Sequence, residues 1–281
     1  MTEGPIVRAS YLLRQHFRYE YPGPIRKLRH RLVIAPPGAY GDQTLVSDRL
    51  VITPDAAVRW GEDTFGNAVA RIAAPHIDEA IELDYEAVVE RSAGAKPTVP
   101  ARWFVDPRFR DPSALTQLDR TLHRAALRLV REGDDPYALA TRINEFVYAH
   151  MHYVPDVTSV VTTAAQAYTL GVGVCQDYAH IMIALARACG LAARYVSGHL
   201  LGEGGTHAWV EIVADPRGSR TAPVWGFDPT HRRETTLSYL FVAAGRDFAD
   251  VTPTSGRFLA PYIGTFTTSR SVDIVSAEYV A

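Results

Sequence analysis

Residues 171–190 read GVGVCQDYAHIMIALARACG, and this stretch decides how the second half of the chain folds. A small, turn-forming opening leads into a long apolar run that ends at Gly190, where a left-handed cap can close a helix. The pattern predicts a central helix that opens at Cys175. Backbone N–H groups at a helix start stabilise a thiolate and can also receive the oxyanion formed when a thiolate attacks a carbonyl. Cys175 is therefore a candidate nucleophile; the alternative is a small packed thiol, the commonest role of a free cysteine.

Helix signals also precede this stretch. Leucines at helical spacing in residues 115–129 predict an amphipathic helix. Asp135 can cap a second helix that has Pro136 at its first position. Residues 163–166 carry the capping-box pattern of a third, short helix, which Gly171 stops. Three helices are thus expected before the candidate nucleophile.

Stretches typical of β-strands lie on both sides of these helices. After the central helix they occur at 193–200, 206–213, 223–228 and, less clearly, 239–243. Helices followed by antiparallel strands predict an α+β domain. Before the helices, short β-prone stretches between residues 6 and 90 predict an all-β, sandwich-like module with a hairpin turn at residues 65–67. The breaker-rich segment 92–97 separates the two, so we expect an N-terminal β domain at 1–95 and the α+β domain at 96–281.

A histidine and an aspartate are candidates to act together with Cys175. His207 starts one predicted strand, Asp228 ends the next, and the turn-rich segment 215–219 lies between them. In an antiparallel hairpin centred near residues 217 and 218, His207 and Asp228 are directly opposite, with Cβ atoms about 4.5–5.5 Å apart. At that separation an aspartate can orient an imidazole and stabilise its cation. The hypothesis depends on the register, since a one-residue slip places the two side chains on opposite faces; the alternative is that both are surface or turn groups.

Other groupings of the same residue types have less support. His180 lies five positions after Cys175 and points about 140° away from it on a helix, so we expect a structural role. A metal site formed by Cys175, Asp177, His180 and His207 is a weak alternative, because no paired Cys or His-x-x-x-His element is present. Asp177 has a simpler role as a first-turn carboxylate. We expect neither a metal nor a cofactor, and no Gly-rich loop with a following Lys supports nucleotide chemistry.

The bulk composition sets limits on partners and location. The 281 residues include 29 basic and 31 acidic side chains, a net charge of −2, so the balance favours neither nucleic acid nor an anionic membrane. The N-terminus lacks a basic-then-apolar leader, and charge or Gly interrupts every apolar run before roughly 18 residues. Cys175 and Cys189 lie about 21 Å apart along one predicted helix at ~1.5 Å per residue, too far for a disulfide. We expect a cytoplasmic, soluble protein with free thiols; the oligomeric state is not readable.

Longer motifs around these residues resemble a known family. The stretch 162–200 (TTAAQAYTLGVGVCQDYAHIMIALARACGLAARYVSGHL), HAWVEI at 207–212 and GFDPTH at 226–231 are similar to the bacterial transglutaminase-like proteins. DTFGN at 63–67 resembles part of that family's N-terminal β domain, and GRDFADV at 245–251 resembles its C-terminal tail. The resemblance implies a papain-like core, in which a helix carrying the nucleophile packs against a sheet carrying histidine and aspartate.

The family's catalytic triad falls on Cys175, His207 and Asp228. The resemblance implies a thiol-dependent enzyme that acts on peptide or glutamine-type amide bonds of a protein or peptide through an acyl-enzyme. We favour a peptidase or amidase over an acyl transferase, because nothing in the sequence resembles an amine-donor site. The tryptophan and the calcium loop of animal transglutaminases have no evident counterpart, so the second oxyanion donor is unassigned. Acyl transfer to a small amine, as in arylamine acetyltransferases, and a non-enzymatic binding module are the alternatives.

Overall fold

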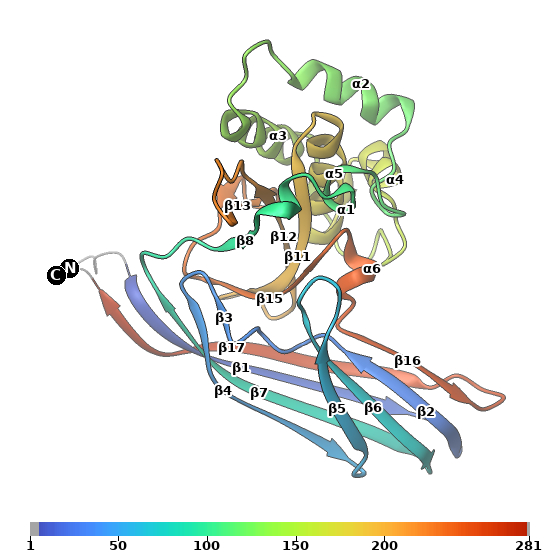
Figure 1. Cartoon of the computed structure of the whole chain (residues 1–281). Coiled ribbons are helices and arrows are strands. Elements are labelled where there is room, and N and C mark those ends of the chain that lie inside the picture. Colours follow the sequence, from blue (N-terminus) through green and yellow to red (C-terminus); the bar gives the residue numbers. More distant parts are fainter. Residues whose placement is uncertain (1–5, 280–281) are drawn as a thin grey trace.

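The structure, a computed structural model, describes residues 6–279. Within these residues the chain forms two units, a layered pair of β-sheets and, above it in Figure 1, a sheet covered by helices. None of the helices described has both the length and the apolar character needed to cross a membrane.

Two antiparallel sheets form a β sandwich. Its strands are β1 (Ile6–Glu20), β2 (Ile25–Leu32), β3 (Ala39–Tyr40), β4 (Gln43–Thr53), β5 (Ala57–Glu62), β6 (Ala68–Ile77), β7 (Ala80–Ser92), β16 (Thr254–Leu259) and β17 (Thr265–Tyr279). The first sheet has the order β17-β1-β7-β4-β3 and the second the order β16-β2-β6-β5. Alternating apolar side chains of both sheets, such as Phe17 and Ile72, are buried between them. The expected sandwich-like module is present, and its β5–β6 hairpin turns where residues 65–67 predict it.

The last two strands belong to this sandwich. β17 pairs with β1 along almost its whole length, from Tyr279 opposite Ile6 to Thr265 opposite Glu20, and β16 pairs with β2. The expected division at 1–95 and 96–281 therefore differs from the observed pairing at its C-terminal end. Most β17 side chains are exposed at the sheet edge, so the segment lacks the apolar alternation from which strands are predicted.

The second unit contains helices packed on an antiparallel sheet. Its helical segments are η1 (Ala101–Phe104), α1 (Pro107–Arg110), α2 (Arg120–Leu129), α3 (Pro136–His150), α4 (Ala164–Leu170), α5 (Cys175–Ala188) and α6 (Phe248–Val251). Its strands are β8 (Thr98–Pro100), β9 (His152–Tyr153), β10 (Val172–Gly173), β11 (Ala192–Leu200), β12 (His207–Val213), β13 (Thr221–Asp228), β14 (Arg233–Glu234) and β15 (Tyr239–Gly245). The sheet has the order β14-β13-β12-β11-β15, with β8 paired to β13.

Helix α5 is the centre of this unit. It packs against β11 and β12 of the sheet and against α2, α3 and α4. Every side chain from Gln176 to Arg187 is buried, which explains the apolar run at residues 181–186 of the sequence. Arg187, the buried arginine of this helix, donates to the carbonyls of Ala193 and Arg246 and to the Thr116 hydroxyl. A helix held on all sides fixes the position of Cys175 at its start.

The local helix signals are confirmed where they involve caps. Asp135 accepts hydrogen bonds from two N–H groups at the start of α3, and Thr163 forms the expected capping box at the start of α4. Gly171 and Gly190, after α4 and α5, have φ of 69° and 82°, the left-handed region in which glycine costs least. Helix α2 is shorter than the leucine spacing in residues 115–129 predicts, because its N-cap is Asp119.

Two amide side chains attach the sandwich to the second unit. The Gln43 side chain donates to the carbonyl of Phe241 and accepts from its N–H, both at 2.8 Å. Asn67 makes the same pair of bonds, also at 2.8 Å, with Ala244. Both partners lie on β15, the edge strand of the sheet, so the two amides satisfy backbone groups that an edge leaves unpaired.

Candidate active site

Cys175 is the first residue of α5 and is half-buried. The turn before it is held by Asp177, whose carboxylate accepts from the Val174 N–H at 2.8 Å and from the Thr158 hydroxyl at 2.6 Å. Burial raises the pKa of Asp177. A Cβ at Gly173 would lie 2.5 Å from this carboxylate, so the close approach requires glycine. Asp177 has the first-turn role expected from the sequence.

Two backbone donors at this helix start are free. The N–H groups of Asp177 and Tyr178 both donate to the Val174 carbonyl, whereas those of Cys175 and Gln176 have no acceptor within residues 6–279. Unsatisfied N–H groups at a helix start, next to a thiol, can bind the oxygen of a carbonyl under attack.

His207 connects the thiol to the predicted carboxylate. Its side chain is 1% exposed, and its Nε2 lies 2.8 Å from Asp228 Oδ2. Although burial alone would lower the pKa of His207, hydrogen bonds to Asp228, to Cys175 and to Glu203 outweigh it and raise the pKa well above the ordinary 6.5. The structure thus brings the three residues chosen from the sequence together. Because a carboxylate only accepts, Nε2 carries the proton shared with Asp228, and Nδ1 is the ring nitrogen that does not contact Asp228.

The register that joins His207 to Asp228 differs from the prediction. Val210 pairs with Phe227, so β13 is displaced by two residues from the direct opposition expected. The turn lies where it was expected, with Ser219 N–H bonded to the Pro216 carbonyl at 2.9 Å, and residues 221–223 pair with β8. A two-residue shift keeps both side chains on the same face. The predicted contact is confirmed, and it runs diagonally between the strands.

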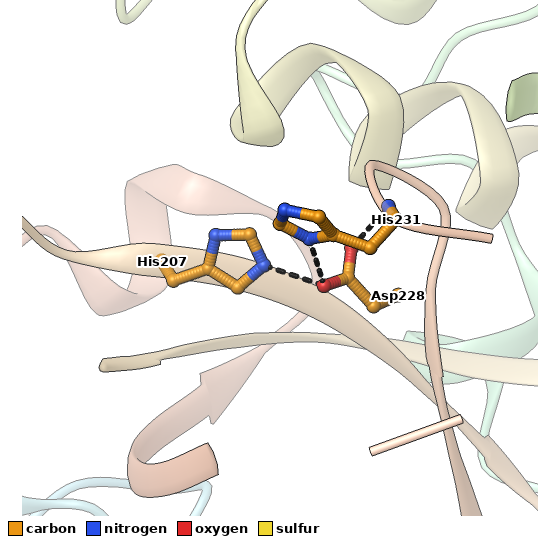
Figure 2. A group of neighbouring side chains, drawn as sticks. All are labelled: His207, Asp228 and His231. Atoms are coloured by element: carbon orange, nitrogen blue, oxygen red, sulfur yellow. Dashed lines mark hydrogen bonds and ion pairs between the residues drawn. The ribbon is translucent and has the colours of Figure 1, made fainter. Parts of the chain in front are cut away.

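Asp228 is the centre of a larger hydrogen-bond network. Its Oδ2 accepts from His207, from His231 Nδ1 at 2.7 Å and from the Tyr239 hydroxyl at 2.6 Å; Figure 2 shows the two imidazoles converging on this oxygen. Its Oδ1 accepts from the N–H groups of Thr230 and His231. Burial opposes the charge, but the bonds from His207, Tyr239 and His231 hold the pKa of Asp228 well below its ordinary value. The buried carboxylate stays charged because five donors point at it.

A second carboxylate, which the sequence did not indicate, lies on the other side of the imidazoles. Glu203 stands in the turn between β11 and β12, with Oε2 3.0 Å from His207 Nδ1 and Oε1 3.3 Å from His231 Nε2. The hydrogen bond with His207 lowers the pKa of Glu203. Since His207 lies between two carboxylates, its doubly protonated form is favoured. The histidine that ends the GFDPTH motif was the only sequence signal for this extension of the site.

Tyr153, also missed from the sequence, lies within electrostatic range of the same group. Burial raises the pKa of Tyr153, and the charges of Cys175 and Glu203 add to the increase. The side chain belongs to the short strand β9, whose partner β10 leads directly into the helix start. Tyr153 therefore lies on the strand pair that leads into the start of α5.

Two sets of residues can be considered as metal ligands. His207, Asp228 and His231 offer ligand atoms within 4.8 Å of one another, and in the structure the two imidazoles are hydrogen-bonded to the Asp228 carboxylate. The other set considered, which included His180, does not converge. His180 is fully buried and accepts from the Phe248 N–H at 3.2 Å, and burial lowers its pKa to about 4. It has the structural role expected.

Cys189 lies at the opposite end of α5 from Cys175 and has different surroundings. It ends α5, its Sγ lies 3.7 Å from the Ala126 carbonyl, and it forms no disulfide. Burial raises its pKa to about 11. It is a packed thiol, as expected.

Comparisons with known proteins match both units. The model of the transglutaminase-like superfamily matches residues 123–221, and that of the bacterial transglutaminase-like N-terminal region matches residues 11–90. An uncharacterized protein of Mycobacterium leprae is 27% identical over 235 residues, 76% of this chain and 81% of its own. One of Mycobacterium tuberculosis is 37% identical over 130 residues, 42% of this chain and 40% of its own. A solved structure of a candidate cysteine protease from Cytophaga hutchinsonii has a TM-score of 0.77 at 21% identity and covers 97% of this chain and 93% of that one; at this identity it shows the fold alone.

Proposed function

The chain belongs to the bacterial transglutaminase-like proteins, and on that premise we propose that it is a thiol-dependent enzyme acting on amide bonds through an acyl-enzyme on Cys175. The observation that carries the proposal is the buried pair of His207 and Asp228, whose Nε2 and Oδ2 lie 2.8 Å apart, together with the interaction of the same imidazole with the Cys175 thiol at the start of α5. Covalent acyl transfer requires a nucleophile, a base and a group that orients the base, arranged so that each can hydrogen-bond to the next.

The arrangement assigns a task to each atom. The Cys175 thiolate attacks the amide carbonyl carbon, and the free N–H groups of Cys175 and Gln176 receive the developing oxyanion. The proton on His207 Nδ1 passes to the leaving amine as the C–N bond breaks, which leaves a thioester. Water or an amine then attacks the thioester and gives a proton to Nδ1, and the thiolate leaves. Asp228 keeps Nε2 protonated, so that Nδ1 remains the nitrogen that exchanges protons.

We favour hydrolysis of a peptide or amide, and amine transfer is the competing outcome. The test is a glutamine-containing peptide incubated with and without a primary amine, comparing the parent protein with Cys175→Ala and with Cys189→Ala as the matched control. Backbone cleavage, ammonia release and amine incorporation, read by mass spectrometry, name a peptidase, an amidase and a transferase respectively. Equal product with parent and Cys175→Ala would refute the proposal.

A binding module without activity is the alternative, and thiol labelling separates it from an enzyme. At pH 6 iodoacetamide should label Cys175 rapidly, because the thiol faces a protonated imidazole at a helix start. Cys189, with a pKa of about 11, stays protonated at that pH and should react slowly. Slow and equal labelling of both thiols would favour the binding module.

For the location we propose the cytoplasm. Both cysteines are free thiols, and free thiols persist in reducing compartments. Cell fractionation followed by detection of the protein with an antibody tests this proposal directly.

A further inference from the structure

The outer faces of the two sandwich sheets carry different charge patterns. On the five-stranded sheet, Arg8, Arg14 and Arg18 of β1 each form an ion pair with a glutamate of the neighbouring strand β7. Positive and negative side chains therefore alternate from strand to strand. This is the usual arrangement, since opposite charges across two strands stabilise a sheet.

On the four-stranded sheet, arginine stands beside arginine. Arg31, Arg71 and Arg59 occupy directly paired positions on β2, β6 and β5. One row along, Arg257 of β16 is paired with Arg29 of β2. We call these five residues the arginine face; it lies on the sheet that Figure 1 labels β16, β2, β6 and β5.

Few carboxylates neutralise the positive charge of the arginine face. Arg31 forms an ion pair with Asp63 at 3.2 Å, whereas within residues 6–279 the other four arginines have no carboxylate within 4.0 Å. Those four side chains are exposed. Like charges directly opposite each other destabilise a sheet, so this pattern does not serve the stability of the fold. The protein as a whole has a net charge of −2, which makes the concentration of positive charge local.

The same face is hollowed. A depression of about 600 Å³ is lined by the five arginines together with small residues that include Ala57 and Ala73. The two alanines are paired with each other and lie in the row of Arg29, so short side chains form the floor and guanidinium groups form the rim. No Tyr, Phe or Trp is among the lining residues.

We propose that the arginine face binds an acidic polypeptide segment that carries carboxylates at alternate positions. The two arginine rows are separated by two residues along each strand, about 6.6 Å at about 3.3 Å per residue. An extended peptide repeats the side chains of one face at the same interval, so carboxylates at positions i and i+2 meet both rows, and the guanidinium fork binds carboxylate in a bidentate manner. Single-stranded nucleic acid is less suited, because stacking of its bases requires aromatic side chains. The inference is independent of the chemistry at Cys175.

The test measures binding of fluorescent peptides to the full-length chain by anisotropy, in the Cys175→Ala background to prevent turnover. An eight-residue Glu-Ala repeat should bind in 50 mM salt and weaken strongly in 500 mM salt, whereas a Lys-Ala repeat should not bind. Arg59→Glu/Arg71→Glu should lower the affinity for the Glu-Ala repeat by at least about tenfold, because two attractive contacts become repulsive. The matched control, Arg14→Glu/Arg18→Glu on the other sheet, should leave the affinity unchanged.

Two further experiments test the proposal, one with other anionic ligands and one on the stability of the fold. Tripolyphosphate, duplex DNA or anionic lipid vesicles that bind to the arginine face while the Glu-Ala repeat does not would overturn the proposal. The Arg59→Ala/Arg71→Ala variant should unfold at the same temperature as its parent or higher, since a repulsion is removed. A lower unfolding temperature together with unchanged peptide affinity would show that the arginines serve the fold, and would also overturn it.

Discussion

Replacing Asp228 by asparagine tests whether the buried charge holds the site together. The two carboxylate oxygens accept five hydrogen bonds, three at Oδ2 and two at Oδ1. An asparagine amide has one oxygen and one NH2 group. If the NH2 replaces Oδ2, it faces His207, His231 and Tyr239; if it replaces Oδ1, it faces two backbone N–H groups. Both orientations set donor against donor, so the site cannot relax by turning the amide over.

The loss of unfolding free energy caused by Asp228→Asn should depend on pH. The direction of this dependence follows from the pKa shifts of Asp228 and His207. The pKa of Asp228 is held below its ordinary 3.8, so its contribution to stability is present above about pH 4 and disappears on acidification. The pKa of His207 is raised above 6.5, so its contribution is complete below about pH 6.5 and decreases as the pH rises towards the folded value. Breaking a buried pair costs about 3–5 kcal/mol. We expect a loss of that size for Asp228→Asn at pH 5 and a clearly smaller one at pH 9.

Urea unfolding at pH 5 and pH 9 measures both values, with Tyr239→Phe as the matched control. That variant removes the hydrogen bond that the Tyr239 hydroxyl donates to Asp228 and the one that it accepts from Arg233, but it keeps the carboxylate. Its cost of about 1.5–3 kcal/mol should therefore be similar at both pH values. An equal loss for Asp228→Asn at pH 5 and pH 9 would refute the reasoning, because it would mean that no charged pair with His207 contributes to the folded state.

Three other changes probe the surroundings of the site. Asn67→Ala removes two hydrogen bonds to the edge strand β15 and should lower the free energy of unfolding by about 1–3 kcal/mol in urea titrations; an unchanged midpoint would contradict the docking role. Gly173→Ala brings a Cβ to 2.5 Å from the Asp177 carboxylate, so iodoacetamide labelling of the Cys175 thiol should slow while circular dichroism stays the same. Glu203→Gln removes one of the charges that raise the pKa of His207, so in NMR titrations this imidazole should lose its proton at lower pH than in the parent; an unshifted titration would count against a role for Glu203.

Hydrogen bonds connect the β5–β6 turn of the sandwich to strand β15 of the second unit. The DTFGN motif at 63–67 forms the β5–β6 turn, and Asp63 accepts from the backbone and side-chain N–H groups of Asn67. This fixes the amide that pairs with β15, the strand next to β11 in the sheet. The resemblance singled out this motif. In the structure it holds Asn67 in position to bond to β15.

The sequence by itself determined the features that depend on residues close together along the chain. The cap at Asp135, the capping box at Thr163 and the glycine stop at Gly190 follow from hydrogen bonds and backbone angles within one turn. The start of the central helix at Cys175 follows from the same local chemistry. Strand positions could also be predicted wherever one face is buried and side chains alternate.

Only the tertiary structure decided the features that depend on distant segments. The two-residue shift between β12 and β13, with Val210 opposite Phe227, is a matter of strand pairing that the residues of the turn do not fix. The return of β17 to β1 joins the two ends of the described chain through backbone bonds that carry no side-chain pattern at an exposed edge. Glu203 reaches His207 from a glycine-rich turn whose course no local propensity fixes. The sequence therefore identified Cys175, His207 and Asp228 as candidates, because their residue types lie at recognisable local positions, whereas the charged groups around them were set by packing.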